Sequence, residues 1–145
     1  MNNVYLQKSR TPVWYLAFKS KAIWTTLNLL TKQIPKTKEE QKFYLMGFWD
    51  ADGGCPKNPV ASKKIYIKFT QKDRKSLDEL KQILEDRFGI SCGNIRISEK
   101  VKNGVIWRFS ITNRKGILKF CKEIGSLHPE KKLRLNKIIE ILSAR

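Results

Sequence analysis

The sequence contains few of the residues that several classes of functional site require. Its 145 residues include three cysteines and a single histidine. Cys55, Cys92 and Cys121 are widely separated and odd in number, so they indicate neither a disulfide framework nor a zinc site of paired cysteines. His128 by itself cannot provide the ligands of a histidine-metal nuclease. We therefore expect a protein of a reducing, intracellular compartment.

Long apolar runs are missing as well. Residues 13–18 are apolar, but Lys19 and Lys21 end this run too early for a signal-peptide core or a membrane span. Glycine and proline number 8 and 5, which is too few to indicate disorder, and 41% hydrophobic residues are enough for a core. The length allows one compact domain with a short appendage, and we expect no membrane partner.

Acidic residues are scarce. Lysine and arginine total 30 against 13 aspartates and glutamates, which gives a formal net charge of +17. Self-repulsion of this size opposes folding, so it indicates a polyanionic partner, DNA or RNA, whose counterions the protein displaces. An anionic membrane is the competing partner. A membrane-surface protein, however, concentrates its basic residues beside one amphipathic helix, whereas here they run from Lys8 to Arg145.

The first 36 residues are predicted to form an N-terminal helical extension. Pro12 can open a helix that continues to Leu30 and ends before Pro35. Two interpretations of this helix stay open: a packing helix, or an additional DNA-contacting arm. The basic residues of such an arm are Lys8, Arg10, Lys19 and Lys21.

Residues 37–145 are predicted to form an α+β domain. Thr37 and Glu40 form a capping-box pattern that opens a helix ending at Gly53. Periodicity, caps and turn signals predict the other elements. These are an edge strand or loop at 55–61, strands at 64–70, around Ile95 and Ile97, and at 105–112, a hairpin turn at Asn103-Gly104, and helices at 73–88, 113–124 and 130–143. This order gives one layer of antiparallel sheet with one face left uncovered.

The uncovered face of the sheet is predicted to be cationic. Along 64–70 the odd-numbered residues are apolar and point inward, which leaves the even-numbered residues on the opposite face. The predicted outward set is Lys64, Tyr66, Lys68, Thr70, Arg96, Ser98, Lys100, Arg108 and Ser110. An ordinary solvated face is the alternative, but such faces usually mix acids with lysines, and here Glu99 is the exception. The pattern favours phosphate contacts and base readout in a major groove.

The segment 45–53 combines features that stability alone would avoid. Asp50 and Asp52 lie where a helix ends, beside unpaired carbonyls and the negative end of the helix dipole. A divalent cation would offset this charge, because the Asp52 carboxylate and a free carbonyl such as that of Ala51 are hard oxygen ligands. The alternative is a helix that simply ends in an Asp-Gly turn.

The same helix carries small residues on one face. Gly47 and Ala51 are four positions apart, which lets another backbone approach closely. If the partner is this helix from a second copy, two Asp52 residues meet at a two-fold axis, and each can hold a metal ion.

Residues 45–53 closely resemble the signature of the LAGLIDADG homing endonuclease family. They match it at Leu45, Gly47, Asp50, Ala51, Asp52 and Gly53 and differ at Met46, Phe48 and Trp49. The predicted αββαββα order over 38–143 is also similar to that family's domain, in which a curved antiparallel sheet forms a DNA-binding saddle. Residues 1–36 lie outside the resemblance.

The resemblance implies an intron- or intein-associated homing endonuclease. Such an enzyme cleaves both strands of a long pseudo-palindromic DNA site by metal-dependent phosphodiester hydrolysis and leaves 3′ overhangs. One copy of the motif implies a homodimer on double-stranded DNA. The implied cofactor is Mg²⁺ or Mn²⁺, with Ca²⁺ as a non-catalytic substitute.

The resemblance also assigns roles to particular residues. Asp52 would bind metal beside the Ala51 carbonyl, Asp50 would pack and cap at the helix end, and Gln71 would orient the hydrolytic water. A basic residue after the turn at Leu127-His128-Pro129 would complete the site, for which Lys132 and Arg134 are both candidates. The implied dimer interface consists of Gly47, Phe48, Asp50 and Ala51. The proline-bearing segment after Gly54 departs from the long strand that the family usually has there, which puts groove contacts by this segment in doubt.

Two other functions remain open from the sequence. A non-cutting relative, either a splicing maturase or a DNA-binding regulator, would keep the scaffold and lose the metal chemistry. A basic ribosomal or RNA-binding protein of another class would explain the net charge alone.

Overall fold

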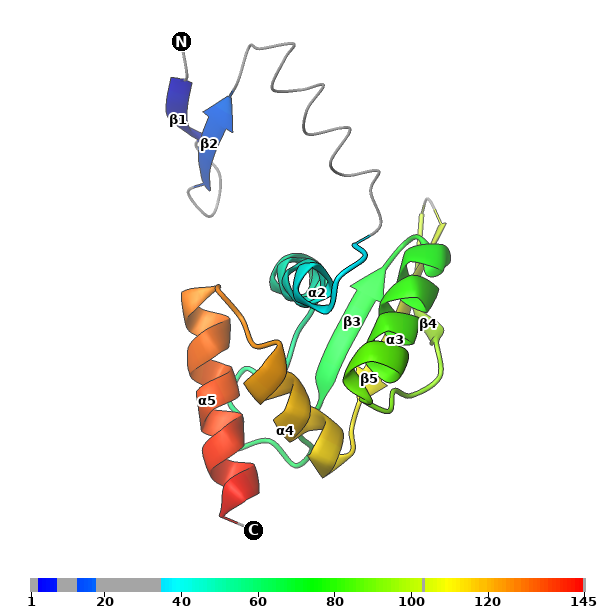
Figure 1. Ribbon diagram of the computed structural model, residues 1–145. Helices are drawn as coiled ribbons and strands as arrows, with labels where there is room; N and C mark the ends of the chain where they lie inside the picture. The colour runs from blue at the N-terminus through cyan, green and yellow to red at the C-terminus, as the bar shows by residue number, and fades with distance from the viewer. Residues whose placement is uncertain (1–2, 8–12, 18–34, 103, 145) are drawn as a thin grey trace. The chain divides into compact units, whose positions relative to one another are not determined.

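The computed structural model describes residues 3–7, 13–17, 35–102 and 104–144 (Figure 1). The chain divides into two compact units, Met1–Ile34 and Pro35–Arg145. This division lies two residues before the boundary predicted between the extension and the domain. Within the described residues, no helix is long and apolar enough to cross a membrane.

The first unit contains two antiparallel strands, β1 (Asn3–Gln7) and β2 (Val13–Ala17), in which Tyr5 pairs with Tyr15. The predicted helix from Pro12 is therefore wrong over β2. A β-branched residue and two aromatic residues begin this segment, and such side chains favour strands over helices. The rest of the predicted helix, 18–30, lies outside the described residues, as do all four basic residues of the predicted arm.

The second unit begins with helix α2 (Lys38–Asp52). The predicted capping box is confirmed: Thr37 Oγ1 accepts a hydrogen bond from the Glu40 backbone N–H (3.1 Å), and Glu40 Oε2 accepts one from the Thr37 N–H (3.0 Å). The helix ends at Gly53, as expected. Leu45 and Trp49 are fully buried and attach α2 to the core.

A three-stranded antiparallel sheet follows, in the spatial order β3-β5-β4. Its strands are β3 (Ile67–Gln71), β4 (Arg96–Val101) and β5 (Gly104–Ile111). The strand predicted at 64–70 thus begins three residues later. Of the two possibilities for 55–61, the loop is the one found, and the preceding Gly54 forms an isolated bridge to Lys68. Pro56 and Pro59 have no N–H to offer a ladder, which accounts for the missing strand.

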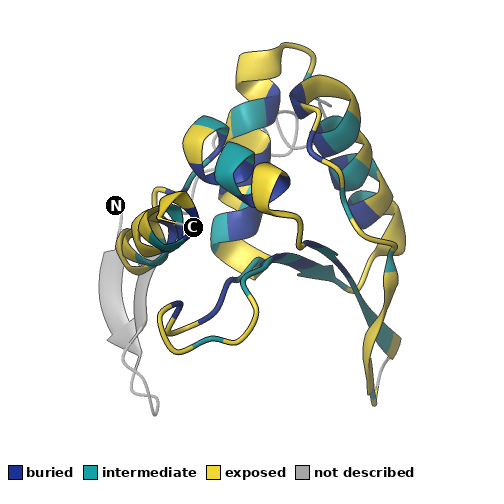
Figure 2. Ribbon diagram, turned by 90° about the horizontal axis from the view of Figure 1, so that it is seen from below, coloured by how far each residue is buried: buried dark blue, intermediate teal, exposed yellow. Residues whose placement is uncertain are grey.

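Three more helices complete the unit: α3 (Arg74–Phe88), α4 (Arg114–Glu123) and α5 (Pro129–Ser143). The helices lie on one side of the sheet and leave its other side open (Figure 2). Phe69 and Phe109 stack across neighbouring strands with ring centroids 4.9 Å apart, and Phe120 from α4 meets both Phe69 and Trp49 edge to face. This aromatic core joins α2 and α4 to the sheet, and the predicted α+β class is confirmed.

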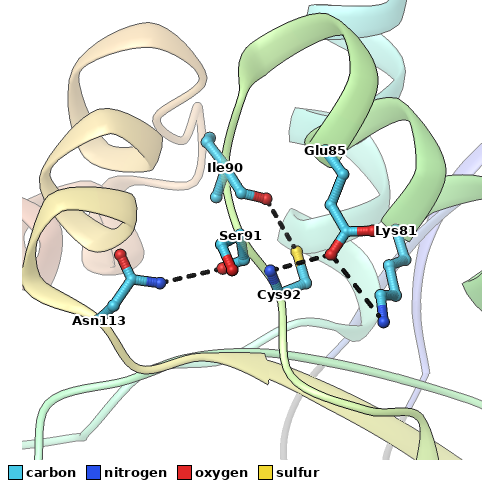
Figure 3. Close-up of polar contacts among 6 residues, drawn as sticks. All are labelled: Lys81, Glu85, Ile90, Ser91, Cys92 and Asn113. Carbon is cyan, nitrogen blue, oxygen red and sulfur yellow. Dashed lines mark hydrogen bonds and ion pairs between the residues drawn. The ribbon is translucent and has the colours of Figure 1, made fainter.

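The segment between α3 and β4 is anchored to α4 by Asn113 (Figure 3). Asn113 Nδ2 donates to the Ser91 carbonyl (3.0 Å), and its Oδ1 accepts from the Gly116 N–H (2.6 Å), so the side chain caps α4 while it holds the segment. On the other side, the Cys92 N–H donates to Glu85 Oε1 (3.2 Å). Burial raises the pKa of the Cys92 thiol to about 12, so this cysteine stays protonated at neutral pH.

Two substitutions of Asn113 distinguish its hydrogen bond to Ser91 from its cap on α4. We expect Asn113→Ala to lower the free energy of unfolding by about 1–2 kcal/mol, because it removes both the cap and the bond to Ser91. Asn113→Asp keeps a capping oxygen and loses the donor, so its effect should be smaller. Urea denaturation followed by circular dichroism measures both. Equal losses in the two variants would show that the cap contributes nothing.

Candidate active site

The Asp52 carboxylate lies at the end of α2 and is exposed to solvent. Two residues from β3 contact Asp52. Gln71 Nε2 donates to Asp52 Oδ2 (3.1 Å), and Thr70 Oγ1 donates to the Asp52 backbone carbonyl (2.6 Å). Asp52 and Gln71, which the sequence placed in one site, are therefore neighbours. Thr70, predicted for the DNA-binding face, pairs with Arg108 in the sheet and also holds the end of α2.

The carbonyl groups at this helix end differ in whether they accept a hydrogen bond. Those of Trp49, Asp50, Asp52, Gly53 and Gly54 all accept hydrogen bonds. The Ala51 carbonyl accepts none from any residue that the structure describes. It is therefore an available oxygen beside an available carboxylate.

Lys131, on the first turn of α5, supplies the positive charge at this helix end. Its ammonium group donates to the carbonyls of Trp49 (2.9 Å), Asp50 (2.9 Å) and Gly53 (2.8 Å), and lies 5.0 Å from the Trp49 ring centroid. Burial lowers the pKa of Lys131, and the nearby Asp50 carboxylate opposes that shift. A lysine therefore offsets part of the negative charge at this helix end, for which the sequence predicted a divalent cation.

Sequence reasoning missed Lys131 and selected its neighbours. Lys132 is exposed, and the Arg134 guanidinium pairs with Glu130 on its own helix. No described contact joins either of them to Asp52. Residues 131, 132 and 134 are all basic and lie on one helix, so only the direction in which each side chain points separates them.

Asp50 connects α2 to the start of α5. Its Oδ1 accepts from the Ser126 hydroxyl, and its Oδ2 accepts from the backbone N–H groups of Leu127 (2.8 Å) and His128 (3.1 Å). The packing and capping role expected of Asp50 matches these contacts. The carboxylate is occupied inside the protomer, which makes it a poor candidate for the dimer interface.

The outward face of α2 is apolar and has no described partner. Gly47 and Ala51 are exposed, and a Cβ built on Gly47 meets no atom within 4 Å. Phe43 is 53% exposed on the same helix, and Leu127, which bonds to Asp50, is 73% exposed. Phe48, predicted for the interface, stacks partly buried against Phe69 with centroids 6.3 Å apart, so it contributes mainly to the core.

The open face of the sheet is hollowed. A cavity of about 670 Å³ is lined by Lys64, Ile65, Tyr66, Lys68, Arg96, Arg108, Ser110 and Thr112. Six of these were predicted to face outward from strand alternation alone. The alternation is preserved in β3, where Ile67 and Phe69 are fully buried between residues that are not.

Strand alternation fails in the second half of β4. The register shifts between Ile97 and Glu99, which leaves Ser98 unpaired, and Lys100 then pairs with Val105. A bulge of one residue reverses which face the following side chains occupy. The predicted position of Lys100 on the cationic face is therefore wrong, because its partner Val105 lies three positions from Arg108 on β5 and points to the opposite face of the sheet. Ser98 and Lys100 are absent from the lining of the hollow.

Comparison with known proteins now agrees with the geometry. Residues 39–125 match the LAGLIDADG-like domain family. This chain belongs to the LAGLIDADG family. Its sequence is similar to the homing endonuclease I-ApeI from Aeropyrum pernix, with 31% identity over 96 residues, which are 66% of this chain and 40% of that protein. The chain thus spans less than half the length of this LAGLIDADG relative.

Solved structures share the LAGLIDADG fold seen here. Full-length DUF199/WhiA from Thermatoga maritima aligns with a TM-score of 0.64 and 19% identity, over 99% of this chain and 43% of that one. Mesophilic variants of the homing endonuclease I-DmoI align with a TM-score of 0.65 and 18% identity, over 94% of this chain and 67% of theirs. I-DmoI in complex with DNA and Ca gives the same TM-score at 17% identity. At these identities the likeness establishes the fold alone, and the predicted family and fold are confirmed.

Lys131 should contribute to stability far more than its neighbour does. We expect Lys131→Met to lower the free energy of unfolding by about 2–3 kcal/mol, because three carbonyls lose a charged donor. Lys132→Met is the matched control, since Lys132 is exposed, and it should change stability by less than about 0.5 kcal/mol. Urea denaturation of the two variants provides the comparison. Similar losses in both would contradict the assigned role of Lys131.

Proposed function

We propose that this protein is a metal-dependent homing endonuclease that cuts both strands of a long, nearly palindromic DNA site inside the cell. The observation that carries the proposal is the exposed Asp52 carboxylate beside the open carbonyl of Ala51. Stability does not require a charged group at the negative end of a helix. The similarity to I-ApeI supports the same reaction class.

The donor set at Asp52 would fit a divalent metal ion. Asp52 and the Ala51 carbonyl offer hard oxygens, which suit Mg²⁺ or Mn²⁺, with Ca²⁺ as a non-catalytic substitute. No group of three or more His, Cys, Asp or Glu side chains converges within the described part of one chain. Remaining ligands would therefore come from the second copy, the DNA phosphate and water. When bound, the ion polarises the phosphate and lowers the pKa of a bound water.

The residues around Asp52 support this chemistry by position and charge. Gln71 holds Asp52 Oδ2, and its amide is near enough to orient a water beside the carboxylate. Lys131 already donates to three carbonyls and fixes the helix end. Lys132 and Arg134 remain the candidates for the cation that stabilises the developing oxyanion, because neither is committed to that helix end.

Self-association of the motif helix is the second part of the proposal. The outward face of α2, with Gly47 and Ala51, is exposed, and exposed apolar surface of this kind indicates an interface. Two helices packed through Gly47 would bring one Asp52 from each copy to a two-fold axis. Two carboxylates in that position match the need to cut two strands.

The cationic hollow supports DNA as the substrate. Its lining combines lysine and arginine with hydroxyl groups and contains no carboxylate. Such a surface contacts phosphates and base edges in a major groove. A non-cutting maturase or DNA-binding regulator would use the same surface, and fold similarity cannot separate these functions. Retention of Asp52 favours cutting.

Asp52→Asn tests the chemistry. We expect strand cleavage to fall by at least about 100-fold, since the amide is a weaker metal ligand, while DNA affinity stays within about threefold. The assay uses DNA that carries the insertion site of the host element, with Mg²⁺. Asp78→Asn, an exposed substitution on α3, is the control and should cut normally. An Asp52→Asn protein with full activity would refute the site, and wild-type protein that binds tightly without nicking would favour the non-cutting alternative.

Gly47→Leu tests the interface. No atom of the protomer lies within 4 Å of an added Cβ, so the fold should be retained, and replacing a helix-interior glycine should even add about 1 kcal/mol of stability. Self-association, measured by analytical ultracentrifugation, should be lost together with double-strand cleavage. Gln82→Leu adds the same side chain to the exposed face of α3 and should leave both intact. A Gly47→Leu protein that still dimerises would rule out this face.

A further inference from the structure

Two arginines that line the cationic hollow are directly opposed on neighbouring strands. Arg108 on the central strand β5 pairs in register with Arg96 on β4 and with Thr70 on β3. Directly opposed side chains on one face of a sheet have Cβ atoms about 5 Å apart, and like charges in this position destabilise the sheet. The protein therefore keeps a costly arrangement at a defined place.

Neither arginine is neutralised by the part of the protein that the structure describes. No ion pair there involves Arg96 or Arg108. The Nε atom of Arg108 is buried and has no hydrogen-bond acceptor. Arg108 lies half-buried on the central strand and lines the hollow.

We infer that Arg108 reads a guanine base in each half of the DNA target; this rests on the proposed function. Arginine donates two hydrogen bonds to the O6 and N7 atoms that guanine presents in the major groove. Adenine is read by Asn or Gln and cytosine by Asp or Glu, and the lining of the hollow contains none of these four. The available side chains thus favour guanine.

Lys64 has a different role in the hollow. Lys64 precedes β3 and is exposed, whereas Arg108 is half-buried on the central strand. A lysine at the rim contacts the phosphate backbone as a point charge and carries no sequence information. Base specificity and general affinity are therefore assigned to separate residues within the same hollow.

The register also predicts where the guanine lies. Thr70, in the same row as Arg108, donates to the Asp52 carbonyl, so this row is adjacent to the proposed catalytic carboxylate. The next row of this face, Lys68 with Ser110, lies further along the strands from Asp52. The guanine read by Arg108 is consequently expected on the side of the half-site nearer the cut than the positions that Lys68 contacts.

Selection from a randomised DNA duplex tests the inference. The full chain with Asp52→Asn, which binds without cutting, is used to select sites, and the same selection is repeated with Arg108→Ala and with Lys64→Ala added. The parent should select guanine at one or two positions in each half-site. Arg108→Ala should lose discrimination for guanine at one position by about 5- to 150-fold. Lys64→Ala should weaken binding to all sequences alike and reduce the slope of log affinity against log salt by about one.

Stability is not expected to limit this experiment, because removing one of two opposed arginines relieves repulsion. Arg108→Gln is a second variant, and its preference at that position should move from guanine toward adenine. Unchanged guanine preference in both Arg108 variants, or selected sites without guanine near the cut, would overturn the inference while leaving the nuclease proposal intact. A chain that does not bind duplex DNA, or that prefers RNA at matched salt, would instead overturn the proposed function.

Discussion

The contact between the Lys131 ammonium group and the end of α2 is the constraint on which the site depends. Three carbonyls from Trp49, Asp50 and Gly53 converge on one cation, and that cation belongs to α5. The motif helix is thereby closed by a distant segment of the same chain. Asp50 adds a second connection, in which a side chain of α2 accepts hydrogen bonds from the backbone that leads into α5.

These contacts leave the Asp52 carboxylate exposed in a way that the local sequence does not explain. The carbonyls of Asp50 and Gly53 are occupied by Lys131, whereas Asp52 is approached from β3 by Thr70, at its backbone carbonyl, and by Gln71, at its carboxylate. A carboxylate at the negative end of a helix is unfavourable by itself. The Lys131 ammonium group at the same helix end reduces this cost, so the fold can present the Asp52 carboxylate to solvent.

A protein with a net charge of +17 could have distributed its cations evenly, yet the open face of the sheet concentrates several of them in one hollow. Arg96 and Arg108 are directly opposed there on neighbouring strands. The hollow lies close to the end of α2, since Thr70 on β3 pairs with Arg108 on β5 and also contacts the Asp52 carbonyl. The proposed base contact and the proposed catalytic carboxylate thus lie beside the same row of the sheet.

The sequence by itself determined the motif helix with its capping box, the α+β order and the outward set of β3, because each of these follows from short-range periodicity. Only the tertiary structure decided which basic residue reaches the helix end, since positions 131, 132 and 134 are chemically alike and differ in direction. It also decided which face of the sheet Lys100 occupies, because a one-residue bulge in β4 depends on pairing with β5 and cannot be recognised from local composition. Local patterns specify an element, and contacts between distant elements select the side chains that act.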